Sequence, residues 1–105
     1  MERQNMPYTS SYIESVTLEV IKQYPIKRAA LFGSAARGDM NEQSDVDIIV
    51  EFLPDTRGLE FFGLHVDLEE ALGCAVDLLT WNALSKAQLS FRKNVESEAR
   101  LIYER

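Results

Sequence analysis

The stretch Leu31-Phe-Gly-Ser-Ala-Ala-Arg-Gly-Asp-Met-Asn-Glu-Gln-Ser-Asp-Val-Asp-Ile-Ile-Val50 decides the fold of this chain. An apolar run stops at Gly33-Ser34, a short polar link follows, and a second apolar run opens with Asp45 and Asp47. Because side chains alternate along a strand, these two carboxylates point to one face while Val46 and the next alternate residues point to the other. The pattern therefore predicts a strand with one core face and one face that carries chemistry.

The segments around this stretch predict further helices and strands. A capping box at Ser11 and Glu14 starts a helical pattern that Pro25 ends. Helices are expected at 11–24, 59–72 and 85–97, with one helical turn at 35–38. Strands are expected at 26–32, 45–52, 75–80 and 100–103. This order predicts an α/β (α+β) fold with a small mixed sheet of about four strands and helices packed mainly on one face.

Length and charge limit the possible classes of protein. With 105 residues, of which 46% are hydrophobic, the chain is expected to form one domain over 1–105, with a loose N-terminal segment at 1–9. A net charge of −6 disfavours direct binding to nucleic acid phosphates. Cys74 is the only cysteine, which excludes an intrachain disulfide and fits a reducing compartment. With no signal-peptide pattern and no run of bilayer length, we expect a soluble cytoplasmic protein without a membrane partner.

A third carboxylate extends the acidic pattern. Asp77 lies in the otherwise apolar strand 75–80, and it would converge with Asp45 and Asp47 if the two strands are neighbours. Three such charges repel one another, and bound cations would remove that cost. Carboxylate oxygens with open coordination positions suit Mg²⁺ or Mn²⁺, so we expect two ions, held by these three residues, with Asp77 also drawing the proton from an attacking hydroxyl.

The glycine turn supplies the matching anion site. Gly33 allows a sharp turn in which backbone N–H groups approach a phosphate closely, and Ser34 adds a hydroxyl. Arg37 is expected to add a phosphate contact. Each signal alone has an ordinary structural explanation: the turn is a loop, the paired acids are a solvated strand end, Asp77 is an exposed edge residue and Arg37 is a solvated helix residue. Their joint occurrence favours a site for a metal-bound triphosphate.

Three other features are interpreted mainly as structural. His65 is expected to be a solvated helix residue. Trp81 is expected at the edge of the core, with bordering of a nucleotide pocket as the alternative. The basic residues Lys86, Arg92 and Lys93 are expected on a solvated helical face, with contact to a triphosphate or an acidic partner as the alternative.

The motifs resemble those of a known family. Gly33-Ser34-Ala-Ala-Arg37-Gly38, then Ser44-Asp45-Val-Asp47, then Val76-Asp77-Leu-Leu, are similar to the minimal nucleotidyltransferase (MNT) group of the DNA polymerase β-like superfamily, over residues 11–103. The resemblance implies the polymerase β-like nucleotidyltransferase fold and transfer of AMP from ATP to a hydroxyl. It also implies that Gly33 and Ser34 contact the phosphates, that Asp45 and Asp47 bind Mg²⁺, and that Asp77 completes the triad.

Many small MNT proteins act as antitoxins and adenylylate a tyrosine of a HEPN-type RNase toxin, so the resemblance implies a HEPN toxin as partner. A chain of this size has few residues outside the nucleotide site with which to recognise an acceptor, which favours a separate protein acceptor or a second subunit. A homodimer is also permitted. Two alternatives stay open: a binding module that neutralises its partner by contact without turnover, and the nucleotide-binding subunit of an enzyme for small-molecule acceptors.

Overall fold

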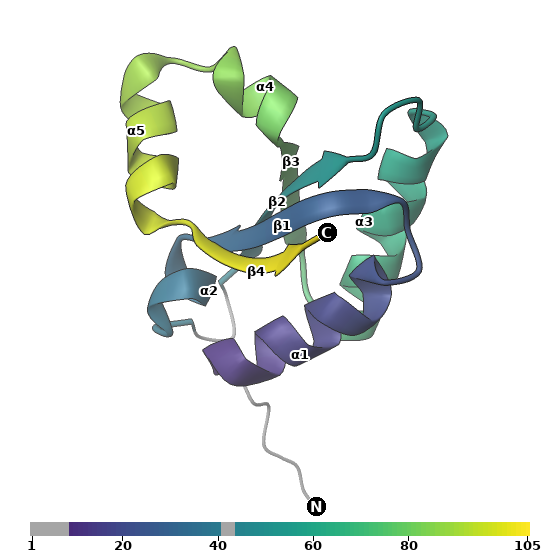
Figure 1. Ribbon diagram of the computed structural model, residues 1–105. Coiled ribbons are helices and arrows are strands. Elements are labelled where there is room, and N and C mark those ends of the chain that lie inside the picture. Colours follow the sequence, from purple (N-terminus) through teal and green to yellow (C-terminus); the bar gives the residue numbers. More distant parts are fainter. Residues whose placement is uncertain (1–8, 41–43) are drawn as a thin grey trace, which may run out of the picture.

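The structure, a computed structural model, describes residues 9–40 and 44–105. Four strands form one sheet, and helices lie on both sides of it (Figure 1). The strands are β1 (Ile26–Phe32), β2 (Val46–Phe52), β3 (Val76–Thr80) and β4 (Arg100–Glu104). The helices are α1 (Ser10–Ile21), α2 (Ser34–Arg37), α3 (Leu59–Leu72), α4 (Trp81–Ser85) and α5 (Leu89–Glu98).

The sheet is mixed, with the strand order β3-β2-β1-β4. β1 runs antiparallel to both β2 and β4, whereas β2 and β3 run parallel. A parallel pair needs a crossover connection, which α3 provides. The predicted mixed sheet of four strands is confirmed, and β2 and β3, which carry the predicted carboxylates, are neighbours.

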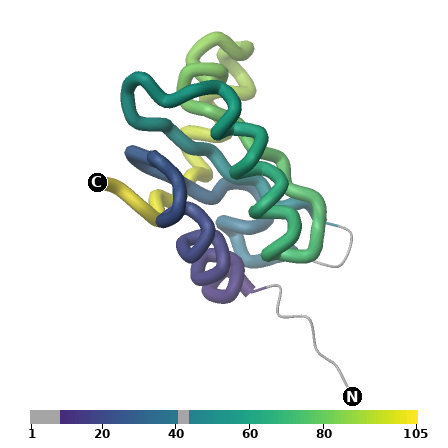
Figure 2. Tube along the Cα trace, turned by 90° about the vertical axis from the view of Figure 1, so that its right-hand side faces the viewer, coloured from purple at the N-terminus to yellow at the C-terminus, as the bar shows by residue number. Residues whose placement is uncertain are grey.

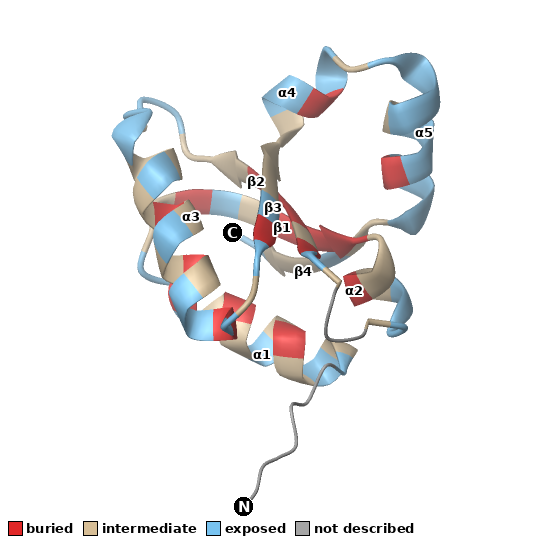
Figure 3. Ribbon diagram, turned by 180° about the vertical axis from the view of Figure 1, so that it is seen from behind, coloured by how far each residue is buried: buried red, intermediate tan, exposed pale blue. Residues whose placement is uncertain are grey.

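One face of the sheet packs against α1 and α3, which also contact each other. The alternate β2 residues Val46, Ile48 and Val50 are buried there. Leu64 and Leu68 of α3 are fully buried in the same core. This is the larger part of the hydrophobic core, and it includes Val46 and Val76 at the starts of β2 and β3. Figures 2 and 3 show α1 and α3 side by side.

The opposite face of the sheet is partly covered by the C-terminal part of the chain. Ala30, Phe32 and Ile49 point to this face and pack with Leu84 of α4 and Val95 of α5. In Figure 1, α4 and α5 form an arch that begins at the end of β3 and leads into β4. β2 was predicted to have one core face and one face that carries chemistry, but beyond Asp47 its second face is also core, because Ile49 is fully buried there.

The first helix starts and ends earlier than predicted. Thr9, not Ser11, is the N-cap, because its side chain accepts a hydrogen bond of 3.2 Å from the Tyr12 N–H. The predicted capping box is wrong, since Glu14 instead pairs with Arg100 at 2.6 Å. The helix ends at Ile21, three residues before Tyr24, because the chain turns ahead of Pro25.

The C-terminal helical segment consists of two helices rather than one. α4 begins directly after β3, where the Thr80 side chain accepts a hydrogen bond of 3.0 Å from the Ala83 N–H. Trp81 therefore opens a helix, and α5 follows after a short break. The bounds of β1 and α3 are as predicted, and those of the remaining elements differ from the prediction by at most one residue. The predicted loose segment lies, apart from Thr9, outside the described residues, as does part of the polar link at 41–43.

Among residues 9–40 and 44–105, every helix is too short or too polar to cross a bilayer.

Candidate active site

Asp47 and Asp77 lie side by side on the sheet. They occupy the same register position on the parallel strands β2 and β3. The neighbouring pair Val46 and Val76, in register one position earlier, is buried in the main core. Because side chains alternate, the two carboxylates project from the opposite face of the sheet. The structure thus brings together the second and third predicted acidic residues.

Asp45 lies directly before β2, two positions from Asp47. Its side chain is exposed, whereas Asp47 is half-buried. The charges of Asp45 and Asp77 both act on Asp47. The three carboxylates therefore form one negatively charged group at the start of the parallel pair, with Asp47 at its centre.

Asp47 is the titratable group that this arrangement perturbs most clearly. Burial, followed by repulsion from Asp77 and then Asp45, raises the pKa of Asp47 to about 6. Arg37 acts in the opposite direction and lowers it. The folded chain therefore holds an uncompensated negative charge at this point near neutral pH, a condition that a bound cation would relieve.

Gly33 lies against the carboxylate of Asp47. It follows Phe32, which is paired in register with Asp47 across β1 and β2. Its backbone dihedrals, φ 65° and ψ −146°, belong to a region that only glycine adopts readily. A Cβ atom at Gly33 would collide with Oδ2 of Asp47. Gly33 of the Gly-Ser turn is thus in direct contact with Asp47, the second of the two paired acidic residues.

Ser34 begins α2, whose Ala36 and Arg37 N–H groups both bond to the carbonyl of Gly33 at 3.1 Å. The N–H groups of Ser34 and Ala35, which precede these bonds, have no partner within the helix and can donate to an anion. The predicted turn at 35–38 is present as α2, which starts one residue earlier and ends at a left-handed Gly38.

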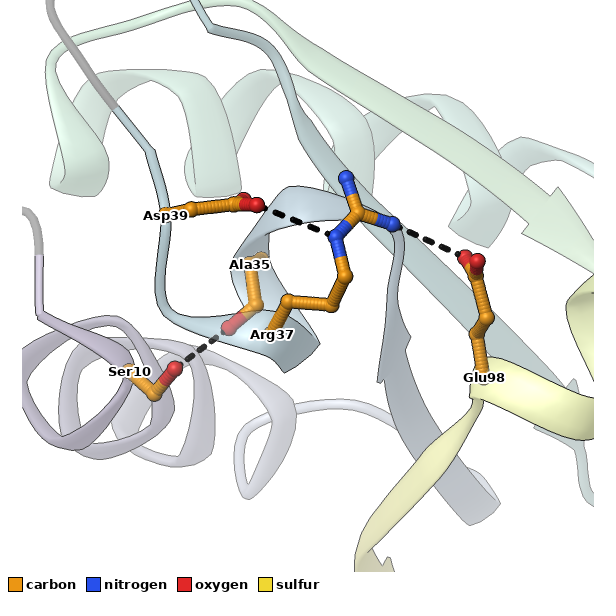
Figure 4. A network of polar contacts seen from close by, with 5 residues as sticks. All are labelled: Ser10, Ala35, Arg37, Asp39 and Glu98. Atoms are coloured by element: carbon orange, nitrogen blue, oxygen red, sulfur yellow. Dashed lines mark hydrogen bonds and ion pairs between the residues drawn. The ribbon is translucent and has the colours of Figure 1, made fainter.

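Arg37 reaches from α2 toward α5 (Figure 4). Its guanidinium pairs with Asp39 at 3.1 Å and with Glu98 at 3.2 Å. The hydrogen bond and charge of Asp39 raise the pKa of Arg37. Because Arg37 also acts on Asp47, a cation lies close to the three carboxylates, although its present partners are two other acidic residues.

The three carboxylates fit a divalent cation only with help from a further ligand. Among the described residues, no three His, Cys, Asp or Glu side chains are arranged to hold a metal ion by themselves. Mg²⁺ commonly binds through one or two carboxylates and completes its octahedron with substrate phosphates and water. The half-buried Asp47, flanked by two more carboxylates, suits that mode of binding better than a closed protein cage.

His65 and Glu69 are the residues that the sequence interpretation missed. His65 was expected to be solvated, but its Nε2 lies 2.8 Å from the carbonyl oxygen of Val76. Glu69, one helical turn later, accepts a hydrogen bond of 2.9 Å from the Val76 N–H. The spacing of these two residues on α3 is visible in the sequence, but nothing there indicates a backbone partner on the next strand.

Trp81 lies away from the carboxylates. It lines a cavity of about 560 Å³ with Phe61 and with residues at the ends of β2 and β3, whereas Asp47 and Asp77 lie near the starts of these strands. The Arg28 guanidinium stacks on its ring at 3.9 Å from the centroid. In the C-terminal basic cluster, Arg92 donates to the Ser85 carbonyl at 3.1 Å and, with Lys93, lines a second cavity beside Trp81.

Comparisons with known proteins match most of the chain. Residues 13–102 match the family model described as "Nucleotidyltransferase domain". A protein of Methanocaldococcus jannaschii named "putative protein adenylyltransferase MJ0435" is 40% identical over 72 residues, which cover 69% of this chain and 77% of the relative. "Protein adenylyltransferase MntA" of Thermococcus cleftensis is 38% identical over 66 residues, covering 63% and 67%.

A solved structure shows the same fold. It is described as a tri-AMPylated Shewanella oneidensis HEPN toxin in complex with MNT antitoxin, and the matching chain superposes with a TM-score of 0.65. The match covers 91% of this chain and 73% of that chain at 18% sequence identity. The resemblance and the fold class inferred from the motifs are confirmed.

Proposed function

Because the chain belongs to the nucleotidyltransferase domain family and is an enzyme of that class, we propose that it transfers AMP from ATP to a hydroxyl of a partner protein, in the presence of Mg²⁺. The main support for the proposal is the contact between the Gly-Ser turn and the carboxylates on β2 and β3. Gly33 closes a turn against Asp47, and Asp47 pairs in register with Asp77. A phosphate-binding turn and a group of carboxylates are thereby adjacent, as nucleotidyl transfer requires.

Each residue has a separate role in this proposal. Backbone N–H groups at Gly33 and the hydroxyl of Ser34 bind the phosphates, and Arg37 adds a positive charge. Asp45, Asp47 and Asp77 would hold Mg²⁺, with Mn²⁺ as a substitute and two ions as the full complement. When bound, the metal neutralises the charge that develops on the phosphate being transferred.

Asp77 also accepts the proton of the attacking hydroxyl. It is exposed, whereas Asp47 is half-buried, and it lies on β3, an edge strand that an acceptor can approach from outside the sheet. The hydroxyl oxygen bonds to the α-phosphorus, the bond to pyrophosphate breaks, and the proton passes to a carboxylate oxygen of Asp77.

For the acceptor, we propose a tyrosine of a HEPN-type RNase toxin, whose activity this chain would block as an antitoxin. The AMPylated toxin in the solved complex and the names of the relatives support this choice. The structural support is the exposure of Asp77, whose carboxylate the hydroxyl of another protein can reach.

The test uses the intact protein, the product of the neighbouring gene, Mg²⁺ and ATP labelled at the α-phosphate. The partner should become labelled, and Asp45→Ala, Asp47→Ala and Asp77→Ala should each abolish labelling while the circular dichroism spectrum stays unchanged. Absence of transfer with the parent protein across nucleotides and metals would contradict the proposal. If Asp47→Ala still protects cells from the partner, neutralisation by contact alone is the correct function.

A further inference from the structure

The outer edge of β3 is bonded to side chains of α3 at one residue, Val76. β3 has a strand neighbour on one side only. In a parallel strand, the N–H and C=O of one residue point to the same side, and the next residue's point to the other. The Ala75 carbonyl accepts a hydrogen bond of 3.0 Å from the Val46 N–H, so the backbone polar groups of Ala75 point toward β2. The polar groups of Val76 therefore point outward, away from the sheet.

Both of these groups are bonded by a pair of residues one helical turn apart. A carbonyl oxygen only accepts hydrogen bonds, so Nε2 of His65 donates to the Val76 oxygen at 2.8 Å. Oε2 of Glu69 accepts from the Val76 N–H at 2.9 Å and lies 3.3 Å from His65 Nε2. The side chains of His65 and Glu69 thus hold the two peptide groups on either side of Val76, an arrangement referred to below as the α3 clamp.

We infer that the α3 clamp is a positioning device for Asp77: His65 and Glu69 fix the backbone at Val76 and so fix where the Asp77 carboxylate stands relative to Asp47. The peptide group that His65 holds is the one that joins Val76 to Asp77. On the inner side, the parallel ladder to β2 sets the register. An edge strand has no ladder on its outer side, and the clamp supplies the missing restraint there.

The inference rests on the proposed function, because Asp77 matters only if the site transfers a nucleotide. In metal sites, mutation of a residue that orients a metal ligand typically lowers activity about tenfold to a hundredfold, and we expect a loss of this size here. The clamp does not touch Gly33, Ser34 or Arg37, so the loss is expected in kcat, with KM for ATP little changed.

The experiment compares truncating and conservative variants in the complete protein. Glu69→Ala and His65→Ala should lower the rate of partner labelling about tenfold to a hundredfold. Glu69→Gln keeps an acceptor for the Val76 N–H, and His65→Gln keeps a donor for its carbonyl, so both should stay close to the parent rate. If His65 and Glu69 served only the stability of the fold, the labelling rates of the alanine and glutamine variants at each position would not differ in this way.

Tyr24→Phe is the matched control. It removes the hydrogen bond that Tyr24 donates to Asp67. Asp67 lies on α3, as His65 and Glu69 do, but this bond does not reach β3. It should lower the melting temperature and leave labelling unchanged. Equal labelling rates for Glu69→Ala and the parent would overturn the inference. It would also be overturned if the labelling rate of each variant, Tyr24→Phe included, simply followed the fall in its melting temperature.

A second measurement separates this inference from the proposed function. If the parent protein transfers nothing, the proposed function fails, but amide hydrogen exchange still reports on the clamp. Exchange of the Val76 amide should be slow in the parent and in Glu69→Gln and faster in Glu69→Ala, with shifted backbone resonances at Asp77. Unchanged Val76 exchange and Asp77 resonances in Glu69→Ala would overturn the clamp whatever the activity.

Discussion

Asp47 and Asp77 occupy the same register position on two parallel strands, so their carboxylates leave the sheet side by side. Their environments differ, because Asp47 is half-buried and Asp77 is exposed. Burial is the largest cause of the raised pKa of Asp47, and repulsion from Asp77 adds to it. This asymmetry has consequences for stability as well as for catalysis.

The first prediction concerns the pH dependence of stability. The pKa of Asp47 is about 6 in the folded chain, above the roughly 3.9 of an unfolded chain. The folded state therefore binds more protons between these values, and the free energy of unfolding falls as pH rises through about 6. Asp47→Asn should abolish transfer and yet raise stability at pH 8 by about 1 kcal/mol, a figure reduced for partial solvation.

Thermal unfolding from pH 3 to pH 8 checks this prediction. A gain of that size raises the melting temperature of a small domain by about 4 to 8 °C. The difference from the parent should disappear below about pH 4, where Asp47 is protonated in both states. A variant less stable than the parent at pH 8 would show that Asp47 has a stabilising partner.

The second prediction concerns the metal. A cation that binds only the folded chain stabilises it by an amount that grows with the logarithm of its concentration, so Mg²⁺ with a non-hydrolysable ATP analogue should raise the melting temperature of the parent. Asp47→Asn should lose this response, and a chelator should reverse it in the parent. Equal shifts in the two proteins would place the metal away from Asp47.

The third prediction tests the turn against Asp47. Gly33→Ala places a Cβ where Oδ2 of Asp47 lies and forces an alanine into a backbone region that costs about 1 to 3 kcal/mol. Transfer should be lost and the urea midpoint should fall. Gly58→Ala is the control, since Gly58 has a φ of −59° and no atom within 4 Å of an added Cβ. It should unfold and react like the parent; equal effects of the two variants would contradict the contact.

The fourth prediction concerns the cation beside the carboxylates. Glu98→Gln weakens one of the two ion pairs that engage Arg37 and removes a negative charge that acts on Asp47. Arg37 is then freer to meet a triphosphate, so KM for ATP should fall about twofold to fivefold with kcat nearly unchanged, an effect of the size of one partly solvated ion pair. Glu70→Gln, on the exposed side of α3, is the charge-matched control. A rise in KM with Glu98→Gln would mean that the pair positions Arg37 for binding.

The fifth prediction concerns the core. Thr17 of α1 is fully buried, and its hydroxyl has no hydrogen-bond partner among the described residues. Thr17→Val keeps the shape and removes the unsatisfied group, so the free energy of unfolding should rise by about 1 kcal/mol. Urea unfolding measures this change, and Thr17→Ser, which keeps the hydroxyl and opens a cavity, should move it in the opposite direction.

Much of the fold was predictable from the sequence because local patterns and tertiary packing agree there. The apolar runs of β1 and β2 and the stop at Gly33 predicted both strands and the turn between them. The pairing of Asp47 with Asp77 was predicted only on the condition that their strands are neighbours, a condition that depends on the crossover through α3.

Two of the errors, at His65 and Glu14, come from contacts with residues further along the chain. His65 was expected in solvent because its partner is a backbone carbonyl, which carries no signal in the sequence. Glu14 was assigned to a capping box, but an ion pair with Arg100, far along the chain, uses its carboxylate instead. The extra helix α4 was missed although Thr80 is a good N-cap, because the strand pattern runs directly into it.

The α3 clamp also affects how the molecule can associate. An open sheet edge invites a strand from another chain, and such pairing is a common route to aggregation. At Val76 both outward backbone groups already have side-chain partners, so a foreign strand would have to displace His65 and Glu69 before it could pair there. The two side chains that restrain the Asp77 backbone therefore also protect the edge of the sheet at Val76, where an approaching protein meets side chains rather than free backbone groups.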